Sequence, residues 1–307
     1  MHVVLGGAGA MGQAVIAALL AQGKTVKAVE RSKVAKGVDT THADLMHPEQ
    51  VQMVVKGANY VYVCIGLPYR NDVWKRDWPR IIRHVIDACE KYQAKLIFLD
   101  NAYMYGPSPL KVPFNEHHLQ FPTTIKGQAR KEVADLILKA HREKRIQAVI
   151  GRSADFYGPF ATNSPFYIQF IENIIVGKNP GFMGKKGVPH TYAFTLDNGK
   201  ALVELALDES CYGEVWHLPV NLPITADEAM IMINRILNSN HKVAYLPQPL
   251  LGIVSLFVPP VKEARPMLYQ FNEPYHMDDS KFRKKFPTFV TTSYEDGFRV
   301  MLNSFKD

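Results

Sequence analysis

Short apolar runs alternate with longer stretches of helical periodicity along the first half of the chain. The apolar runs have the length and β-branched content of buried parallel strands. They cover residues 2–5, 24–29, 59–65, 95–99 and 146–151. The stretches between them carry apolar residues at helical spacing, chiefly over residues 13–21, 72–92 and 123–143. This alternation predicts an α/β chain built on an open parallel sheet.

Beyond residue 160 the even alternation lapses. A strand is predicted over residues 214–218, and it could rejoin the main sheet. Two extended segments are predicted over residues 188–196 and 241–246. The remaining predicted elements are helices over residues 164–176, 197–207, 225–237, 280–286 and 293–305, and a proline-interrupted helical pair over 250–271. The second half is therefore expected to build a smaller region of less regular architecture.

The glycines after the first predicted strand point to a phosphate site. The sequence Gly-Gly-Ala-Gly-Ala-Met-Gly follows that strand, and an alanine-rich helix follows in turn. In this context Gly6 would make the tight turn, Gly9 would let the backbone approach a pyrophosphate, and Gly12 would let the helix pack against the strand. The first turn of the helix, with Ala10 and Met11, would face the anion. A glycine-rich turn without a ligand is the alternative, but the strand–turn–helix context favours a dinucleotide site.

The end of the second predicted strand carries opposite signals about the nucleotide. Glu30 could accept hydrogen bonds from the adenosine ribose, which favours NAD, whereas Arg31 could hold a 2′-phosphate, which favours NADP. Arg31, Ser32 and Lys33 together would form an anion-binding nest. On this ground NADP is favoured over NAD.

Two further positions border the predicted cofactor site. Asp44, which precedes Leu45, could accept a hydrogen bond from the adenine amino group, or it could cap a turn before His47. Gly66 follows the strand over 59–65 and would let the cofactor lie over the edge of the sheet.

Composition narrows the function classes. The 307 residues are 47% hydrophobic and 21% charged, which is typical of a folded protein with a core. The net charge of +7 is not gathered in one basic block, so we expect no nucleic-acid partner. The longest apolar run, residues 250–258, is far shorter than the roughly 20 residues of a membrane span, so we expect no membrane association. Cys64, Cys89 and Cys211 lack metal or redox spacing and are expected to be buried free thiols in a reducing cytoplasm.

Several segments together resemble the extended short-chain dehydrogenase/reductase superfamily, in its NAD(P)-dependent epimerase/dehydratase branch. They are Gly6-x-x-Gly9-x-x-Gly12, Asp44-Leu45, residues 101–106 (NAYMYG), Arg152-x-x-Asp155-x-Tyr157-Gly158-Pro159 and residues 191–197 (TYAFTLD). The resemblance implies a Rossmann-type doubly wound parallel sheet with a smaller C-terminal substrate-binding region. We therefore expect an NAD(P)-binding domain over residues 1–160, rejoined by 191–220, and a substrate-capping region over 161–190 and 221–307.

The residues that usually perform catalysis in that family are replaced here. Members usually carry Tyr-x-x-x-Lys on the helix after the fifth strand, with tyrosine as general acid or base and lysine holding the nicotinamide ribose. Lys126 and Arg130 stand at these positions, and Asn101 stands where serine or threonine is usual. Arg130 could still bind ribose hydroxyls, and Asn101 could donate to a carbonyl oxygen. Lys126 could donate a proton or could be a surface lysine without a role, and Tyr103 is a candidate substitute acid.

The predicted substrate contacts follow the strand over residues 146–151 or lie in the extended segment over residues 188–196. They are Asp155, Tyr157, His190 and Tyr192. Asp155 could accept from a substrate hydroxyl or pair with Arg130, and His190 and Tyr192 would line the pocket. The histidines of the chain lack the spacing of metal ligands, so no metal site is expected.

Two functions agree with these observations. The first is an NAD(P)-dependent oxidoreductase or epimerase for a sugar-like or small carbonyl substrate, with Lys126-x-x-x-Arg130 replacing the usual pair. The second is a non-catalytic NAD(P)-binding redox sensor or partner-binding protein, which the missing tyrosine favours. We prefer the first, because a large closed cleft over a nicotinamide is seldom kept for binding alone. In the resembled family the helices after strands four and five often form a dimer interface, so a homodimer is expected.

Overall fold

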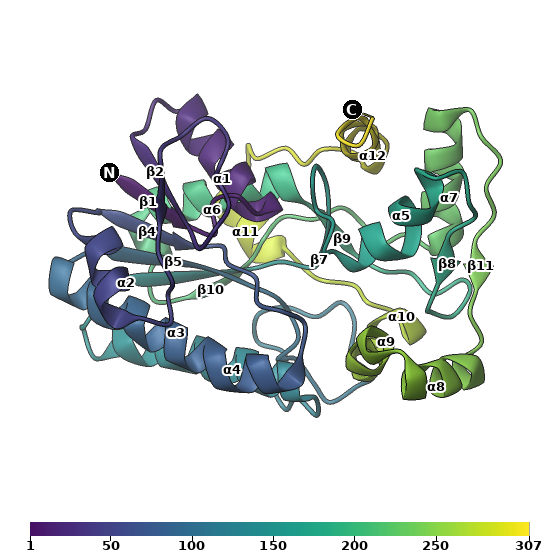
Figure 1. Cartoon of the computed structure of the whole chain (residues 1–307), viewed down its shortest axis with the longest axis horizontal. Coiled ribbons are helices and arrows are strands. Elements are labelled where there is room, and N and C mark those ends of the chain that lie inside the picture. The colour runs from purple at the N-terminus through teal and green to yellow at the C-terminus, as the bar shows by residue number, and fades with distance from the viewer. Residues whose placement is uncertain (307) are drawn as a thin grey trace. The chain divides into compact units, whose positions relative to one another are not determined.

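A seven-stranded parallel sheet is the largest sheet of the computed structural model, which describes residues 1–306 (Figure 1). Its strands are β1 (His2–Leu5), β2 (Val26–Glu30), β3 (Thr40–His42), β4 (Tyr60–Val63), β5 (Lys95–Asp100), β6 (Ala148–Arg152) and β10 (Val215–His217). They lie in the order β10-β6-β5-β4-β1-β2-β3. The strand order changes direction between β1 and β4, and open parallel sheets bind ligands at the carboxyl ends of strands around such a point.

Helices cover both faces of this sheet (Figure 1). Helices α1 (Ala10–Ala21) and α6 (Thr195–Leu207) lie together on one face, where a Cβ on Gly199 would come within 2.6 Å of the carbonyl oxygen of Ala14. The other face carries α2 (Pro48–Val55), α3 (Asn71–Tyr92) and α4 (Ile125–Arg142). Strands β1, β4, β5 and β6 are almost completely buried between the two helical layers, and their sequences are mostly apolar, whereas β2 and β3 are only partly buried. The predicted doubly wound α/β fold is confirmed.

The strand predicted over residues 214–218 is β10, and it joins the main sheet as expected. Strand β10 pairs in parallel with β6, with Val215 opposite Ile150 and His217 opposite Arg152. The sheet therefore gains its last strand from residues far beyond the point at which regular alternation ends.

The chain divides into two compact units. The first contains Met1–Met104, Ile125–Ser153 and Leu196–Leu218, and the second contains Tyr105–Thr124, Ala154–Thr195 and the chain from Pro219 onward. Residues 105–124, which the sequence placed in the cofactor domain, thus belong to the second unit. The roles of the two units remain predictions.

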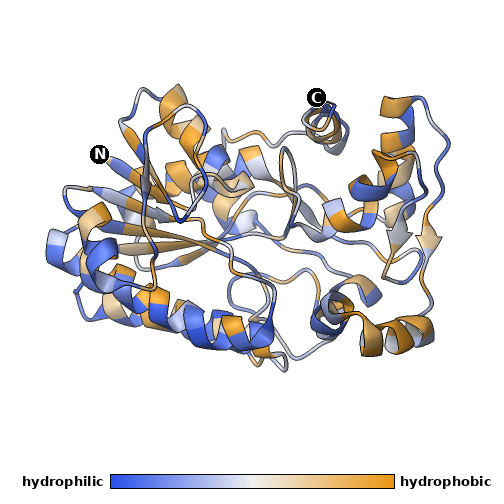
Figure 2. Cartoon of the chain, in the orientation of Figure 1, coloured by the Kyte–Doolittle hydropathy of each residue, from blue (hydrophilic) through white to orange (hydrophobic). Residues whose placement is uncertain are grey.

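The second unit is built on short strands and an aromatic core. Strand β7 (Asp155–Tyr157) pairs with β9 (Tyr192–Phe194), and β8 (Gly181–Phe182) pairs with β11 (Ala244–Tyr245). Its helical segments are a π-helical turn (Tyr167–Ile171), α5 (Glu172–Ile174), α7 (Ala226–Leu237), α8 (Gln248–Phe257), α9 (Pro259–Ala264), α10 (Tyr269–Asn272), α11 (Ser280–Lys285) and α12 (Tyr294–Asn303). Figure 2 shows α8 as hydrophobic along most of its length, whereas α3 and α4 mix hydrophilic and hydrophobic residues.

Three expectations from composition can be compared with residues 1–306. No helix in that range is both long and apolar enough to cross a membrane. Within the same range no cluster of three or more His, Cys, Asp or Glu side chains could hold a metal ion. The cysteines are free and buried, and burial raises the pKa of the Cys64 and Cys89 thiols to about 12.

Candidate functional site

The glycine loop between β1 and α1 is shaped by backbone contacts. Gly6 has a φ of +83°, and a Cβ there would lie 2.8 Å from the Cα of Ile65. At Gly12 a Cβ would collide with the carbonyl oxygen of Gly6, which places the first turn of α1 directly against the loop. A side chain would therefore open the loop at either position, as the sequence predicts for a dinucleotide turn.

The start of α1 presents backbone donors that the helix itself does not use. Gly9 is the exposed N-cap residue, and it supplies no side-chain cap. The amides of Ala10, Met11 and Gly12 lie in the first turn, where α-helical geometry provides no carbonyl partner. No acidic residue lies in that turn. The N-terminus of α1 therefore retains its affinity for an anion.

Glu30 ends β2 beside this loop. The backbone amide of Ala8 donates to Glu30 Oε1 at 2.5 Å, so the carboxylate is tied to the residues between β1 and α1. Arg31 and Lys33 are exposed. The strand end thus places a negative charge next to the glycines.

Asp44 takes the turn-capping role that its sequence context allowed. Its Oδ1 accepts from the backbone amide of Met46 at 2.9 Å, just before α2. Leu45 is buried, and its carbonyl oxygen lies 2.9 Å from His84 Nδ1. Gly66 is exposed after β4, and a Cβ there would meet nothing within 4 Å.

A buried carboxylate between two arginines ends β5. Asp100 Oδ1 accepts from Arg130 Nε at 2.8 Å, and its Oδ2 accepts from Arg152 Nε at 3.1 Å. Arg130 also donates to the carbonyl oxygen of Leu99 at 2.9 Å. All three charged side chains are almost completely buried, and burial lowers the pKa of Arg130 while Asp100 opposes this shift.

Arg130 therefore has other partners than the cofactor ribose expected from the sequence. Its guanidinium carbon lies 4.4 Å from the Trp78 ring and 4.7 Å from the Phe98 ring. A long cation on the inner face of α4 reaches the acidic strand end beside it, because a buried carboxylate requires a charged partner. The sequence analysis did not assign Asp100 or Arg152 to the site. Their charge within an otherwise apolar strand end was the available signal.

Asn101 follows this cluster directly. Its backbone amide donates to Asp100 Oδ1 at 2.9 Å, and its own Oδ1 accepts from the Tyr103 amide at 3.1 Å. Within residues 1–306 the Nδ2 amide of Asn101 has no hydrogen-bond partner, so it can donate to an external oxygen. Tyr103 is buried and stacks on Trp74 with ring centroids 6.0 Å apart.

Lys126 is a buried lysine at the start of α4. Only 1% of the residue is exposed, which rules out the alternative of a surface lysine. Its Nζ donates to Asn71 Oδ1 at 2.9 Å and lies 4.2 Å from the centre of the Tyr69 ring. Both of these partners are neutral. The sequence analysis missed Asn71 and Tyr69, because no motif marks the start of α3 or the loop before it.

The second unit pairs two of the predicted substrate residues. His190 Nε2 lies 3.0 Å from Asp155 Oδ2, and its Nδ1 lies 3.0 Å from the carbonyl oxygen of Gln270. Asp155 thus takes His190 as its partner. Tyr157 and Tyr192 are buried in the aromatic core of this unit, and their roles as substrate contacts stay predictions.

A model of the NAD dependent epimerase/dehydratase family matches residues 2–207. The chain belongs to this family. It is a family of NAD-dependent enzymes, so the predicted family and the predicted enzyme class are both confirmed. A search of the curated proteins found no match to the sequence.

Solved structures of other epimerases and dehydratases share the fold at low sequence identity. The UDP-N-acetylglucosamine 4-epimerase from Bacillus cereus is 16% identical with a TM-score of 0.80, over 99% of this chain and 96% of that one. The UDP-glucose 4-epimerase from Thermotoga maritima, solved with UDP-glucose, is 18% identical with a TM-score of 0.80, over 100% and 99%. A double mutant of the dTDP-glucose 4,6-dehydratase from Streptomyces venezuelae, solved with NAD bound, is 14% identical with a TM-score of 0.80, over 100% and 97%.

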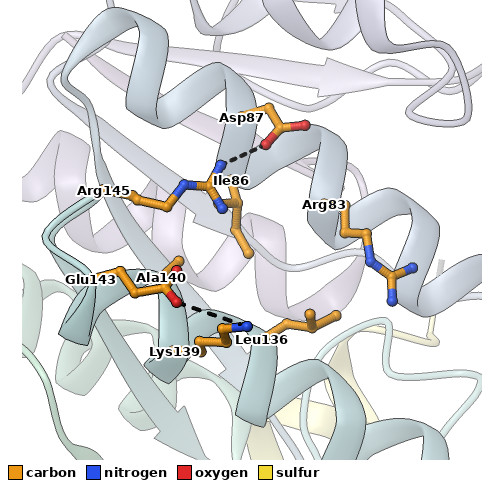
Figure 3. A pocket seen from close by; sticks show the side chains of 8 residues that line it. All are labelled: Arg83, Ile86, Asp87, Leu136, Lys139, Ala140, Glu143 and Arg145. Carbon is orange, nitrogen blue, oxygen red and sulfur yellow. Dashed lines mark hydrogen bonds and ion pairs between the residues drawn. The ribbon is translucent and has the colours of Figure 1, made fainter.

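A hollow between α3 and α4 lies away from the site of this family member (Figure 3). Arg145 donates to Asp87 Oδ1 at 2.9 Å, and Lys139 lies 3.8 Å from Glu143. These residues are in or just beyond the C-terminal halves of the two helices, which lead back to the amino ends of the strands. Arg83, which also lines the hollow, pairs with Glu132 outside the lining. The hollow lies at the opposite end of the sheet from the glycine loop.

Proposed function

We propose that this chain is an NAD-dependent oxidoreductase or epimerase that acts on a sugar-like or small carbonyl substrate. The observation that carries the proposal is the uncapped N-terminus of α1 at Gly9, with the Glu30 carboxylate held beside it. A Cβ at Gly12 would close this cradle, so the residues present fit a dinucleotide. Gly9, Ala10 and Met11 would hold its pyrophosphate, and Gly66 would leave room for it at the sheet edge.

The position of Glu30 favours NAD over the NADP that the sequence favoured. A carboxylate held at the loop can accept from the ribose hydroxyls, and it would repel a 2′-phosphate. If NADP were bound, the exposed Arg31 would have to offset the repulsion between Glu30 and the 2′-phosphate. Asp44 and Leu45 would border the adenine. Bound NAD would accept or return a hydride at its nicotinamide ring.

Asn101 and Lys126 are the proposed contacts to the reacting oxygen. The free Nδ2 amide of Asn101 would polarise a carbonyl oxygen, and the buried ammonium of Lys126 would supply the proton. Tyr103 would support Asn101 through the hydrogen bond between its amide and Asn101 Oδ1. Arg130 acts as a positioning residue, because it fixes Asp100, whose Oδ1 also accepts from the Asn101 amide.

The substrate class is supported by the structural neighbours, which are sugar-nucleotide enzymes. We propose that the second unit contributes contacts to a small-molecule substrate of this kind, with neither nucleic acid nor membrane as a partner. The free buried thiols support a cytoplasmic location. The homodimer through α3 and α4 remains a prediction.

The test is redox change or epimerisation in the NAD-loaded protein. UDP-glucose and dTDP-glucose are added, and the nicotinamide absorbance and the products are followed. Wild type should turn over, and Lys126→Met should lower the rate by about 10²- to 10⁴-fold with unchanged NADH affinity. Lys131→Met, an exposed lysine on the same helix, should change nothing. NAD binding without turnover on sugar nucleotides and small carbonyl compounds would favour the non-catalytic alternative.

A further inference from the structure

The tautomer of His190 is fixed by its surroundings. His190 Nδ1 faces the backbone carbonyl oxygen of Gln270 at 3.0 Å, and a carbonyl oxygen only accepts. Nδ1 therefore carries a proton. In a neutral imidazole the other nitrogen, Nε2, would then be an acceptor.

The contact to Asp155 requires one more proton. Nε2 lies 3.0 Å from Asp155 Oδ2, and two acceptors cannot form a hydrogen bond with each other. The pair therefore holds a proton in common, as imidazolium and carboxylate or as imidazole and carboxylic acid. Either form ties Asp155 Oδ2 to the ring and leaves Oδ1 for another donor.

The ring is held rigidly. It stacks between Phe271 and Tyr275, with centroids 4.6 and 4.5 Å away, and only 2% of the His190 side chain is exposed. Tyr269 and Tyr275 are close enough that the Asp155 charge, together with burial, raises the pKa of both hydroxyls. These tyrosines stay protonated and add no charge to the pair.

Two hydrogen-bond acceptors here have no donor within residues 1–306. One is Asp155 Oδ1, on a side chain that keeps 8% of its surface exposed. The other is the buried Oε1 of Gln270, the residue whose carbonyl binds His190. Because Gln270 Oε1 is buried, only Asp155 Oδ1 is open to a ligand, and an acceptor without a donor fits a ligand that brings a hydroxyl group and disfavours an anionic one.

We propose that Asp155 Oδ1 binds a hydroxyl group of the substrate, and that His190 is the positioning residue that holds Asp155 in place for it. This inference rests on the proposed function and narrows its substrate class to hydroxyl-bearing, sugar-like molecules. As a carboxylate beside the imidazolium, Asp155 would accept a charge-assisted hydrogen bond, which is stronger than one accepted by an amide in the same place.

Asp155→Asn tests the proposal in a folded protein. The asparagine Nδ2 can donate to His190 Nε2 while Nδ1 still binds Gln270, so the contacts persist but the shared proton and the charge disappear. With NAD-loaded protein, the affinity for UDP-glucose should fall about tenfold, while the affinities for UDP and NADH stay unchanged. His190→Asn should raise KM for UDP-glucose more than it lowers kcat.

NMR of the full chain labelled with ¹⁵N-histidine gives an independent result. Wild type should show protons on both sides of the His190 ring, and Asp155→Asn should lose the one at Nε2. An unchanged spectrum in the variant, or equal UDP-glucose affinities, would overturn the inference, as would failure of wild type to bind UDP-glucose. Failure to bind NADH would instead overturn the proposed function, and the NMR result would be unaffected by it.

Discussion

Two regions at the carboxyl edge of the same sheet direct their polar groups differently. The glycine loop after β1 presents backbone amides outward and carries no side-chain charge of its own. The end of β5 carries charges that are satisfied inward, because Asp100 binds both Arg130 and Arg152. The glycine loop can bind a ligand through its backbone because side chains are absent there. The function of the charged side chains at the end of β5 depends instead on the partners with which they pair.

The largest expected effect comes from breaking the inward-facing region. Asp100→Asn removes the carboxylate that binds both buried arginines, Arg130 and Arg152, and it should lower the free energy of unfolding by about 3 kcal/mol. Urea denaturation measures this change. Asp135→Asn, which removes an exposed partner of Lys131, should cost no more than about 0.5 kcal/mol. Equal losses in the two variants would contradict the role of the cluster.

Gly12→Ala breaks the outward-facing region instead. The new Cβ would collide with the Gly6 carbonyl oxygen, so the loop must open, with a cost of about 2 kcal/mol and loss of NADH binding. Gly181→Ala is the matched control, because its Cβ would meet only Leu246 at 3.8 Å. Stability and NADH titration are measured together. NADH binding that survives in Gly12→Ala would show that the loop is not the cofactor site.

The stability of the protein should also depend on pH through His2, the first residue of β1, which leads into the glycine loop. Burial lowers the pKa of His2 from 6.5 to about 4, so the unfolded chain binds a proton below pH 6.5 that the folded chain does not. His2 should therefore reduce stability as the pH falls from 6.5 to 4, by at most about 1.4 kcal/mol per pH unit. Urea titrations across this range should show a shallower slope in His2→Gln. An equal slope would show that other groups cause the loss.

The smallest expected effect concerns the choice of nucleotide. Glu30→Gln should narrow the preference for NADH over NADPH by about tenfold, because the carboxylate no longer repels the 2′-phosphate. Arg31→Ala should leave NADH affinity unchanged. Fluorescence titration of both variants provides the measurement. A loss of NADPH affinity in Arg31→Ala alone, with no effect of Glu30→Gln, would show that Arg31 and not Glu30 determines the preference between the two nucleotides.

The sequence predicted the fold and the glycine loop because both rest on local patterns. Apolar runs specify buried strands, and the role of Gly12 depends on the Gly6 carbonyl oxygen six residues before it, although the turn at Gly6 also packs against the distant Ile65. The partners of Arg130 and His190 could not be predicted in this way. Asp100 is 30 residues from Arg130, and Gln270 is 80 residues from His190, so only the folded chain brings them together. Lys126 shows the same limit, since its burial depends on Asn71 and Tyr69, which precede it by more than 50 residues.

Titration of the wild-type protein with NADH and NADPH tests the central claim most directly. The account predicts binding of both at one site, with NADH bound more tightly, because Glu30 lies beside the uncapped start of α1. Tighter binding of NADPH would contradict the role of Glu30. Binding of neither nucleotide would contradict the cofactor site itself.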